Sequence, residues 1–93
     1  MKIVWTRTAR RGLEHLHAYV LEHDPAAADR MAAAIHDSVE TLTQFPARGR
    51  PGRVPGTREL VVVGTPFLVP YKLEGERLEI IAVLRGARRW PPD

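Results

Sequence analysis

Three β-strand patterns joined by very short connections fill much of the second half of the sequence and restrict what the chain can form. They occupy residues 58–63 (RELVVV), 67–73 (FLVPYKL) and 78–84 (LEIIAVL). Connections of three and four residues are too short for the crossover that parallel neighbours need, so the three strands must form an antiparallel meander. Pro70 cannot donate to a β-ladder and predicts an edge position or a bulge. The last stretch is apolar at nearly every position, which predicts a central strand buried on both faces.

A helical hairpin is predicted upstream of these strands. Apolar residues recur at helical spacing in two stretches, one on each side of Asp24 and Pro25. Asp24 can accept hydrogen bonds from the free amides of the second helix, and Pro25 suits the first helical position because an N–H there would have no partner. The two stretches therefore predict an αα-hairpin over roughly residues 8–45 that ends at Pro46. A short strand at residues 2–5 (KIVW) precedes it.

The order of these elements, β-α-α-β-β-β, predicts an α+β fold in which the hairpin packs on one face of a mostly antiparallel sheet. The chain has room for a single domain, residues 1–93. It has no cysteine, no phosphate-binding motif and no histidine pair at the i, i+4 spacing of a helical metal site, so we expect neither a metal nor a cofactor. No apolar run approaches the roughly 18 residues of a membrane span, and the first residues lack a secretory pattern. We therefore expect no membrane association and a cytoplasmic location.

Positive charge is concentrated in the second half of the chain. Residues 1–46 carry five basic and six acidic side chains, whereas residues 47–93 carry nine basic and five acidic ones. Twelve of the fourteen basic residues are arginine, whose planar guanidinium suits carboxylate and phosphate alike. The second half therefore predicts an anionic partner, either nucleic acid or an acidic protein segment, with a solvated arginine-rich surface as the alternative.

Seven of these nine basic residues, all except Lys72 and Arg77, fall in two segments. One is the proline- and glycine-rich connection FPARGRPGRVPGTREL at residues 45–60, which must lie over the folded body because a domain this small leaves no room for a disordered spacer. The other is the end of the chain after the last strand. The candidate partner-binding residues are Arg48, Arg50, Arg53, Arg58, Arg85, Arg88, Arg89 and Trp90. We predict that the two segments converge in one patch. The alternatives are an ordinary loop with solvated arginines and a Trp90 that packs on the core.

Three stretches resemble one known family. TRTARRGLEHLHAYVLEHDPAAADRMAAAIHDSVETLTQFP is similar to its first helical hairpin, with Leu13, Leu16 and Tyr19 at the positions of an A…DL…I..Y pattern. RVPGTRELVV is similar to the PG.RE start of its next strand, and VPYKLEGERLEIIAVLRGARRWP to its YRV…VEI..VLH.RR.WP ending. The chain as a whole resembles the RelE/ParE superfamily of type II toxin–antitoxin toxins, and more closely its ParE-like branch.

The resemblance implies a RelE/ParE-like fold and a growth-inhibiting toxin that a cognate antitoxin holds inactive. In such systems an acidic segment of the antitoxin wraps over the toxin, and a separate part of the antitoxin binds DNA. This chain would then meet operator DNA only through the antitoxin. The superfamily has two kinds of target: RelE-like members cut mRNA on the ribosome, and ParE-like members are associated with poisoning DNA gyrase.

The residues themselves favour the second target. RNA cleavage through the 2′-hydroxyl needs a proton acceptor and a proton donor, and arginine stays protonated. Residues 47–93 contain no histidine, and the histidine that the family carries after its last strand is Arg85 here. For a nuclease, the candidate residues would be Glu59, Arg58, Arg85 and Tyr71. We therefore predict a non-nuclease gyrase poison with no assigned catalytic residue. A RelE-like ribosome-dependent endoribonuclease and a non-toxic nucleic-acid-binding domain are the alternatives.

Overall fold

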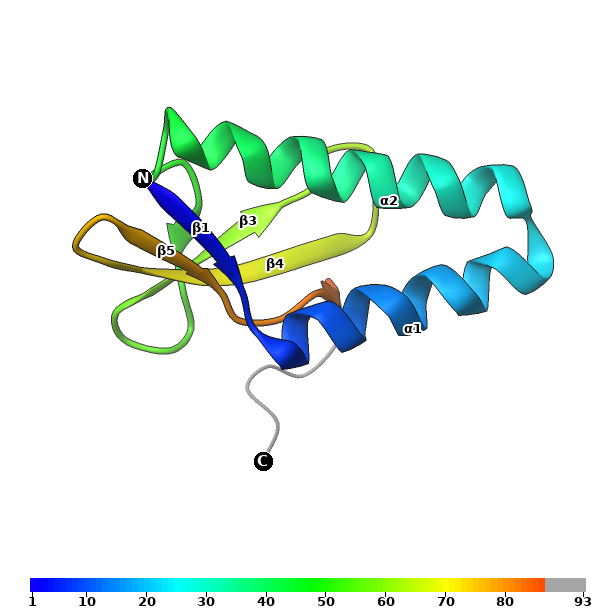
Figure 1. Cartoon of the computed structure of the whole chain (residues 1–93), viewed down its shortest axis with the longest axis horizontal. Helices are drawn as coiled ribbons and strands as arrows, with labels where there is room; N and C mark the ends of the chain where they lie inside the picture. The colour runs from blue at the N-terminus through cyan, green and yellow to red at the C-terminus, as the bar shows by residue number, and fades with distance from the viewer. Residues whose placement is uncertain (87–93) are drawn as a thin grey trace.

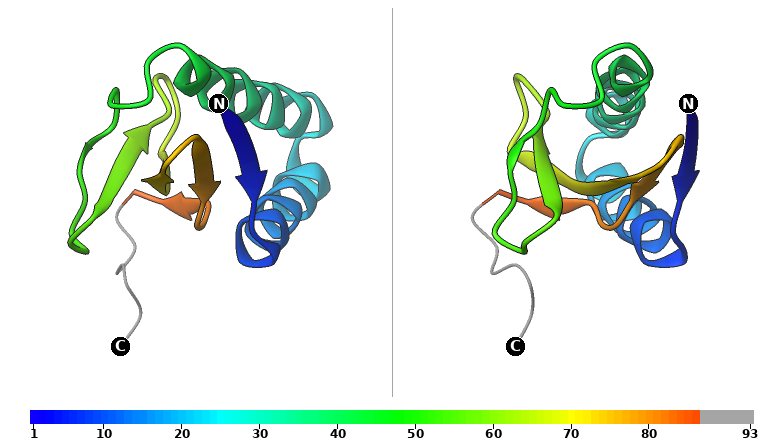
Figure 2. Two further views of the ribbon diagram at one scale, coloured as in Figure 1. Left: turned by 60° about the vertical axis from the view of Figure 1, so that its left-hand side comes forward. Right: turned by 90° about the vertical axis from the view of Figure 1, so that its left-hand side faces the viewer.

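The computed structural model describes residues 1–86 of the chain. Its elements follow in the order β1 (Lys2–Trp5), α1 (Arg7–His23), α2 (Pro25–Glu40), the 3₁₀ turn η1 (Thr41–Thr43), β2 (Arg50–Pro51), β3 (Thr57–Val61), β4 (Phe67–Glu74), β5 (Arg77–Ile80) and β6 (Leu84–Arg85). The two helices form a hairpin (Figure 1) that covers one face of the sheet (Figure 2). The predicted α+β fold with its β-α-α-β-β-β order is confirmed, and β2 and β6 are short additions that the sequence did not reveal.

Two capping residues set the geometry of the hairpin. The Thr6 hydroxyl accepts from the N–H of Ala9 at 3.1 Å and donates to the carbonyl of Ile81 at 3.1 Å, which ties the start of α1 to the sheet. The N–H of Asp24 bonds back to the last turn of α1, while its carboxylate accepts from the N–H of Ala27 at 3.1 Å. One residue therefore ends the first helix and begins the second, which brings the two helices together as the sequence predicted.

The strands lie in the order β1-β5-β4-β3-β2, with β1 parallel to β5 and the other neighbours antiparallel. β4 is therefore the centre of the sheet, and its residues 67–71 are all buried. The last strand is interior as predicted, because β5 lies between β1 and β4, but the predicted burial on both faces is not found, since Leu78 and Ile80 are buried while Arg77 and Glu79 are not. The apolar run at residues 78–84 misled that prediction because it does not form one continuous strand.

A β-bulge divides this apolar run into β5 and β6. Tyr71 pairs with Ile80 and Leu68 pairs with Leu84, so the partner strand contains one residue more than β4 over the same length. The bulge lies opposite Pro70, whose carbonyl accepts an N–H of the bulged residues at 2.9 Å. The nitrogen of Pro70 has no hydrogen to donate to the bulged strand. The extra residue in that strand makes up for the missing ladder bond. The predicted association of Pro70 with a bulge is confirmed.

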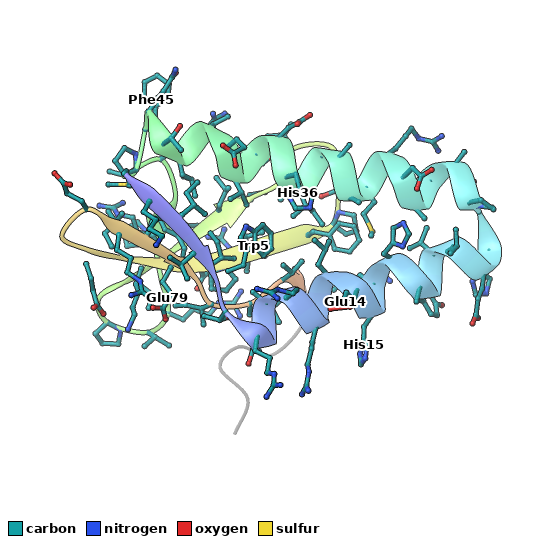
Figure 3. The ribbon with its side chains drawn as sticks, in the orientation of Figure 1. Trp5, Glu14, His15, His36, Phe45 and Glu79 are labelled. Atoms are coloured by element: carbon teal, nitrogen blue, oxygen red, sulfur yellow. The ribbon has the colours of Figure 1, made fainter. Side chains whose placement is uncertain are left out.

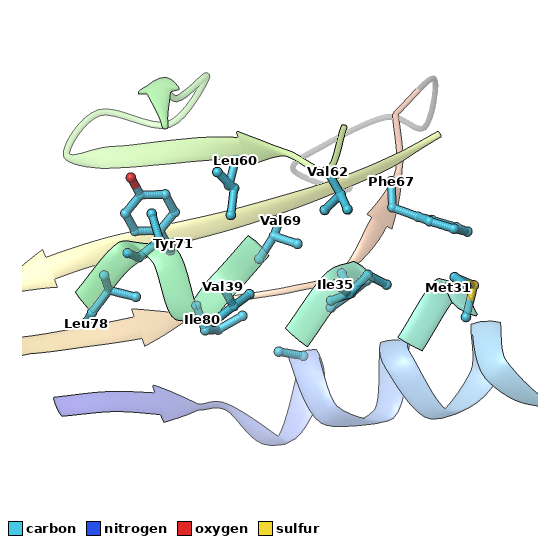
Figure 4. Packing of buried hydrophobic residues seen from close by; sticks show 13 residues of the cluster. Met31, Ile35, Val39, Leu60, Val62, Phe67, Val69, Tyr71, Leu78 and Ile80 are labelled. Atoms are coloured by element: carbon cyan, nitrogen blue, oxygen red, sulfur yellow. The ribbon is translucent and has the colours of Figure 1, made fainter. Parts of the chain in front are cut away.

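The core lies between the hairpin and the sheet (Figure 4). Its labelled members are Met31, Ile35 and Val39 from α2 and Leu60, Val62, Phe67, Val69, Tyr71, Leu78 and Ile80 from the sheet and its turns. α1 approaches the sheet closely at Gly12, where an added Cβ would lie 3.1 Å from the carbonyl oxygen of Val83. Within residues 1–86, neither helix has the length and apolarity to cross a membrane.

Candidate binding surfaces

We call residues 45–56, between η1 and β3, the arginine loop. Tyr71 ties its first part to the sheet, because the fully buried hydroxyl donates to the carbonyl of Pro46 at 2.7 Å and accepts from the N–H of Gly49 at 2.9 Å. Burial raises the pKa of Tyr71, against the smaller lowering effects of the Gly49 hydrogen bond and the Arg58 charge, so the group stays a neutral donor. A Cβ added to Gly49 would lie 2.6 Å from the Tyr71 ring, so a larger residue does not fit without a shift.

Glu59 on β3 ties down the second part of the arginine loop. Its side chain is 1% exposed, and one carboxylate oxygen accepts from the backbone N–H of Arg53 at 2.9 Å. The other oxygen lies 3.4 Å from Nη2 of Arg50 and 3.6 Å from Nε of Arg53. A buried carboxylate is tolerated when it is paired and hydrogen-bonded, and these contacts supply both. Next to it, Arg58 donates from Nη1 to two loop carbonyls at 2.8 and 3.2 Å. The loop therefore has a fixed path although it contains little regular structure.

Two arginines of the loop, Arg50 and Arg53, lie beside Glu59 on the face of the sheet away from the helices. Arg50 is the cross-strand partner of Glu59, so the two side chains share one face of the sheet. The adjacent Leu60 points into the core, which turns the Glu59 face outward. The side chains of Arg50 and Arg53 remain 56% and 41% exposed beside the buried carboxylate, and Arg48 is exposed as well. An anionic partner can therefore still reach all three guanidinium groups.

Arg85 lies on the opposite face of the sheet. It pairs with Phe67, whose ring belongs to the core, so its side chain is on the helix side. The predicted convergence of Arg85 with the arginine loop is therefore not found in the part of the chain that the structure describes. The other predicted residues of the chain end, Arg88, Arg89 and Trp90, lie outside the described residues.

A cleft of about 570 Å³ runs between α1 and the bulge. On the helix side it is lined by residues at helical spacing, Thr8, Gly12, His15 and Tyr19, and on the strand side by the bulge and Arg85. Figure 3 shows His15 projecting from α1 away from α2. Sequence reasoning missed this neighbourhood because it sought a histidine in the same half of the chain as Arg85. The available signal was the polar stripe along α1.

A second hollow of about 540 Å³, which we call the helix–sheet groove, lies between the hairpin and the turn that joins β3 to β4. Its lining is mostly apolar and includes the buried Phe67, while Tyr19 and Val63 remain 61% and 82% exposed. The charged residues among its described lining are Arg30 and Arg85. Exposed apolar surface rimmed by charge is typical of a protein-interaction site.

Comparison with known proteins identifies the class. The family of the ParE toxin of the type II toxin–antitoxin system parDE matches residues 3–90. The chain therefore belongs to the ParE toxin family, within the RelE/ParE superfamily that its sequence resembles, and is a toxin of the type II toxin–antitoxin class.

Relatives from both branches of the superfamily are similar to this chain. The putative toxin Y4kP of Sinorhizobium fredii is 41% identical over 97% of this chain and 93% of its own length. Toxin RelE2 of Caulobacter vibrioides is 32% identical over 94% and 97%. Among solved structures, a chain of the chromosomal ParDE system from P. aeruginosa matches with a TM-score of 0.83 at 28% identity, covering 91% of this chain and 95% of that one. A chain of the RelBE2 complex from Mycobacterium tuberculosis matches with a TM-score of 0.65 at 26% identity, covering 90% and 95%.

Proposed function

We propose that this toxin inhibits growth in the ParE-like manner, by poisoning DNA gyrase without cutting RNA. The proposal rests on the hydrogen bonds that already occupy Tyr71 and Glu59, the two candidates for acid–base catalysis. RNA cleavage needs a side chain that can take a proton from the 2′-hydroxyl. The hydroxyl of Tyr71 is buried and used both as donor and as acceptor, and the 1% exposed Glu59 already accepts from the arginine loop. Neither group can reach a substrate while the loop keeps this path.

The remaining candidates suit binding better than proton transfer. Arg58 holds two loop carbonyls, and Arg48, Arg50 and Arg53 present cations that do not give up their protons. The ParE family match and the higher TM-score with the ParDE chain, 0.83 against 0.65 for the RelBE2 chain, also support the ParE-like interpretation. The tail residues Arg88, Arg89 and Trp90 stay part of the proposed binding set. Gyrase is the target that this interpretation implies.

The proposed partner is a cognate antitoxin. Both structural relatives belong to toxin–antitoxin systems, and the exposed arginines suit an acidic segment laid over the toxin. Such a segment would occupy the same cations that grip the target, so neutralisation would follow from occlusion. Operator DNA would be contacted only by the antitoxin, and the proposal involves neither a cofactor nor a membrane.

Induction of the toxin alone in a bacterial host tests the proposal. We expect loss of viability, a rise in DNA-damage signalling and no cuts in codon register when mRNA 5′ ends are mapped. Co-expression of the protein encoded by the adjacent reading frame should restore growth. Codon-register cuts would overturn the non-nuclease mechanism, and unimpaired growth would favour the non-toxic nucleic-acid-binding alternative.

A RelE-like endoribonuclease is the second candidate, and the cleft beside α1 favours it. There His15 supplies the proton-transfer group that the basic half lacks, and it shares the cleft with Arg85 and the exposed ring of Tyr19. An imidazole, a guanidinium and an aromatic platform could act on the hydroxyl, the phosphate and the base of an RNA segment. If cuts appear, His15→Gln should abolish them while His36→Gln, a matched change at an exposed position on α2 outside the cleft, leaves them intact.

A further inference from the structure

The outer edge of β6 faces α1 across the cleft beside that helix. β6 pairs with β4, and the N–H of Gly86 donates to the carbonyl of Pro66 at 2.6 Å, so Arg85 turns its own N–H away from β4. Two residues earlier the same edge meets α1, because a Cβ added to Gly12 would lie 3.1 Å from the oxygen and 3.6 Å from the nitrogen of Val83. Within the part of the chain that the structure describes, no backbone group accepts from the N–H of Arg85. This donor is therefore available at the cleft.

Two side-chain donors line the same cleft. The guanidinium of Arg85 is exposed, and so is His15, which projects from α1 away from α2 (Figure 3). Neither side chain makes a hydrogen bond or ion pair within the described residues. The described lining of the cleft contains no carboxylate that would repel an anion. A guanidinium, an imidazole and a backbone N–H around one cleft are suited to bind a phosphate group.

An aromatic ring lies one helical turn beyond His15. Tyr19 lines the cleft and is 61% exposed. Its ring packs against that of His23, with the centroids 5.0 Å apart, and Nδ1 of His23 lies 3.0 Å from the carbonyl oxygen of Tyr19. The Tyr19 ring is therefore supported by a neighbouring ring while much of its surface stays open. Such a ring can stack a nucleobase, largely irrespective of which base it is.

The dimensions of the cleft fit one nucleotide. Its volume of about 570 Å³ lies within the roughly 300–1,000 Å³ of small-molecule sites, and Leu16, Ala82 and Leu84 add apolar surface to it. His15 and Tyr19 are four residues apart on a helix, so their Cβ atoms are about 5–6 Å apart. A ribose separates a phosphate from its base over a comparable span.

We propose that the cleft between α1 and the bulge binds a free mononucleotide, with its phosphate on Arg85 and His15 and its base on the ring of Tyr19. One ring and one cluster of donors suit a single nucleotide, whereas a strand needs a track of cations and successive rings. This ligand is distinct from the proposed gyrase target and from the antitoxin, so the toxin would have a small-molecule site of its own.

Calorimetric titration of the full-length toxin with AMP tests the site. We expect AMP to bind in the submillimolar range and adenosine, which lacks the phosphate, to bind at least about 10-fold more weakly. Inorganic phosphate, which lacks the base, should also bind more weakly than AMP. In NMR spectra the amide signal of Arg85 should shift on addition of AMP, whereas that of Glu76, in the exposed turn between β4 and β5, should not.

Substitutions separate the phosphate contact from the base contact. Arg85→Gln should weaken AMP binding about 10-fold and leave adenosine binding unchanged, because only the phosphate meets the guanidinium. Arg77→Gln, at an exposed position on β5 outside the cleft, is the matched control and should change the AMP affinity less than about 2-fold. Tyr19→Ala should weaken AMP and adenosine alike, since both carry the base.

Four outcomes would contradict the proposal. Equal affinities for AMP and adenosine, or equal effects of the two arginine substitutions, overturn the phosphate contact. No AMP binding at millimolar concentration overturns the site. Binding of a single-stranded oligonucleotide through Arg85 and Tyr19 without binding of AMP overturns the free nucleotide in favour of a nucleic-acid surface. None of these results alters the growth and DNA-damage readouts that test gyrase poisoning.

Discussion

The arginine loop has little regular secondary structure yet is held by buried polar contacts, whereas the helix–sheet groove is built from regular elements yet leaves apolar side chains in solvent. In the loop, Tyr71 and Glu59 supply contacts that β2 alone could not. In the groove, Tyr19 and Val63 lie at the surface although both are large and apolar. The buried polar groups around the arginine loop hold that loop in one conformation, whereas the helix–sheet groove leaves apolar surface open to a partner.

This difference separates stability from binding along the chain. A change at a buried group of the loop should unfold or loosen the toxin, and its effect on toxicity would then be indirect. A change at the exposed residues of the groove should leave the fold intact and alter only association. Substitutions in the two regions can therefore be ordered by their effect on the free energy of unfolding.

Removal of the Glu59 carboxylate should have the largest effect. Glu59→Ala leaves the backbone N–H of Arg53 without its acceptor and opens a void in a site that is 1% exposed. We expect the free energy of unfolding to fall by about 2–4 kcal/mol, measured by urea denaturation. Glu76→Ala, in the exposed turn between β4 and β5, should change it by less than about 0.5 kcal/mol. Equal losses at the two sites would mean that the carboxylate does not hold the loop.

Removal of the Tyr71 hydroxyl should have a smaller effect. Tyr71→Phe keeps the ring in the core but deletes the hydrogen bonds to Pro46 and Gly49. The expected loss is about 1–2 kcal/mol in the free energy of unfolding, together with faster proteolysis of the arginine loop. Tyr19→Phe, at a tyrosine that is 61% exposed, is the matched control and should change neither quantity. An unchanged proteolysis rate in Tyr71→Phe would show that the loop keeps its path without this anchor.

The same substitution should change how stability depends on pH. Because burial raises the pKa of Tyr71, the unfolded chain loses the phenol proton first as the pH rises above about 10. The folded chain then binds more protons than the unfolded chain, so stability falls with rising pH in that window. Tyr71→Phe should fall less steeply than the unchanged toxin above about pH 10, in denaturation curves collected at several pH values. Parallel slopes would contradict the assignment.

Local signals predicted much of the fold. Asp24 and Pro25 act within one turn of their own position, and the short connections after Val63 and Glu74 leave no choice but antiparallel neighbours. Pro70 marked its bulge because a missing N–H has the same consequence in any sheet. Each of these features depends on a few adjacent residues.

The face on which Arg85 lies could not be predicted in this way. Ile80 points into the core, and strict alternation would turn Arg85, five residues later, to the other side. The single extra residue of the bulge reverses this parity and pairs Arg85 with the core residue Phe67. The anchoring role of Glu59 was hidden for a similar reason, since its partners in the loop are fixed by the pairing of β2 with β3. The binding sites therefore depend on register, which the sequence pattern does not define.

Two adjacent valines that directly follow β3 allow a buried and an exposed position to be compared. Val62→Thr places a hydroxyl in the core at a fully buried position and should cost about 1–2 kcal/mol. Val63→Thr makes the same change at an 82% exposed position and should shift the free energy of unfolding by less than about 0.5 kcal/mol. In the second variant we expect a several-fold weaker complex with the antitoxin, measured by calorimetry. Wild-type affinity in Val63→Thr would place the partner elsewhere.

The smallest effect is expected at the ion pair between Lys72 and Glu74, whose charged groups lie 2.9 Å apart. The hydrogen bond and charge of Lys72 lower the pKa of Glu74, and those of Glu74 raise the pKa of Lys72. Their contribution is therefore present at neutral pH and is lost as the pH falls below the usual carboxyl range or rises above the usual lysine range.

Both side chains of this pair are exposed, at 37% and 66%, so water and salt screen the attraction. Glu74→Gln should leave the urea midpoint at pH 7 unchanged within error, although the contact is shorter than either ion pair between Glu59 and the guanidinium groups of Arg50 and Arg53. A loss as large as that of Glu59→Ala would mean that contact distance, and not burial, determines what a carboxylate contributes to this sheet.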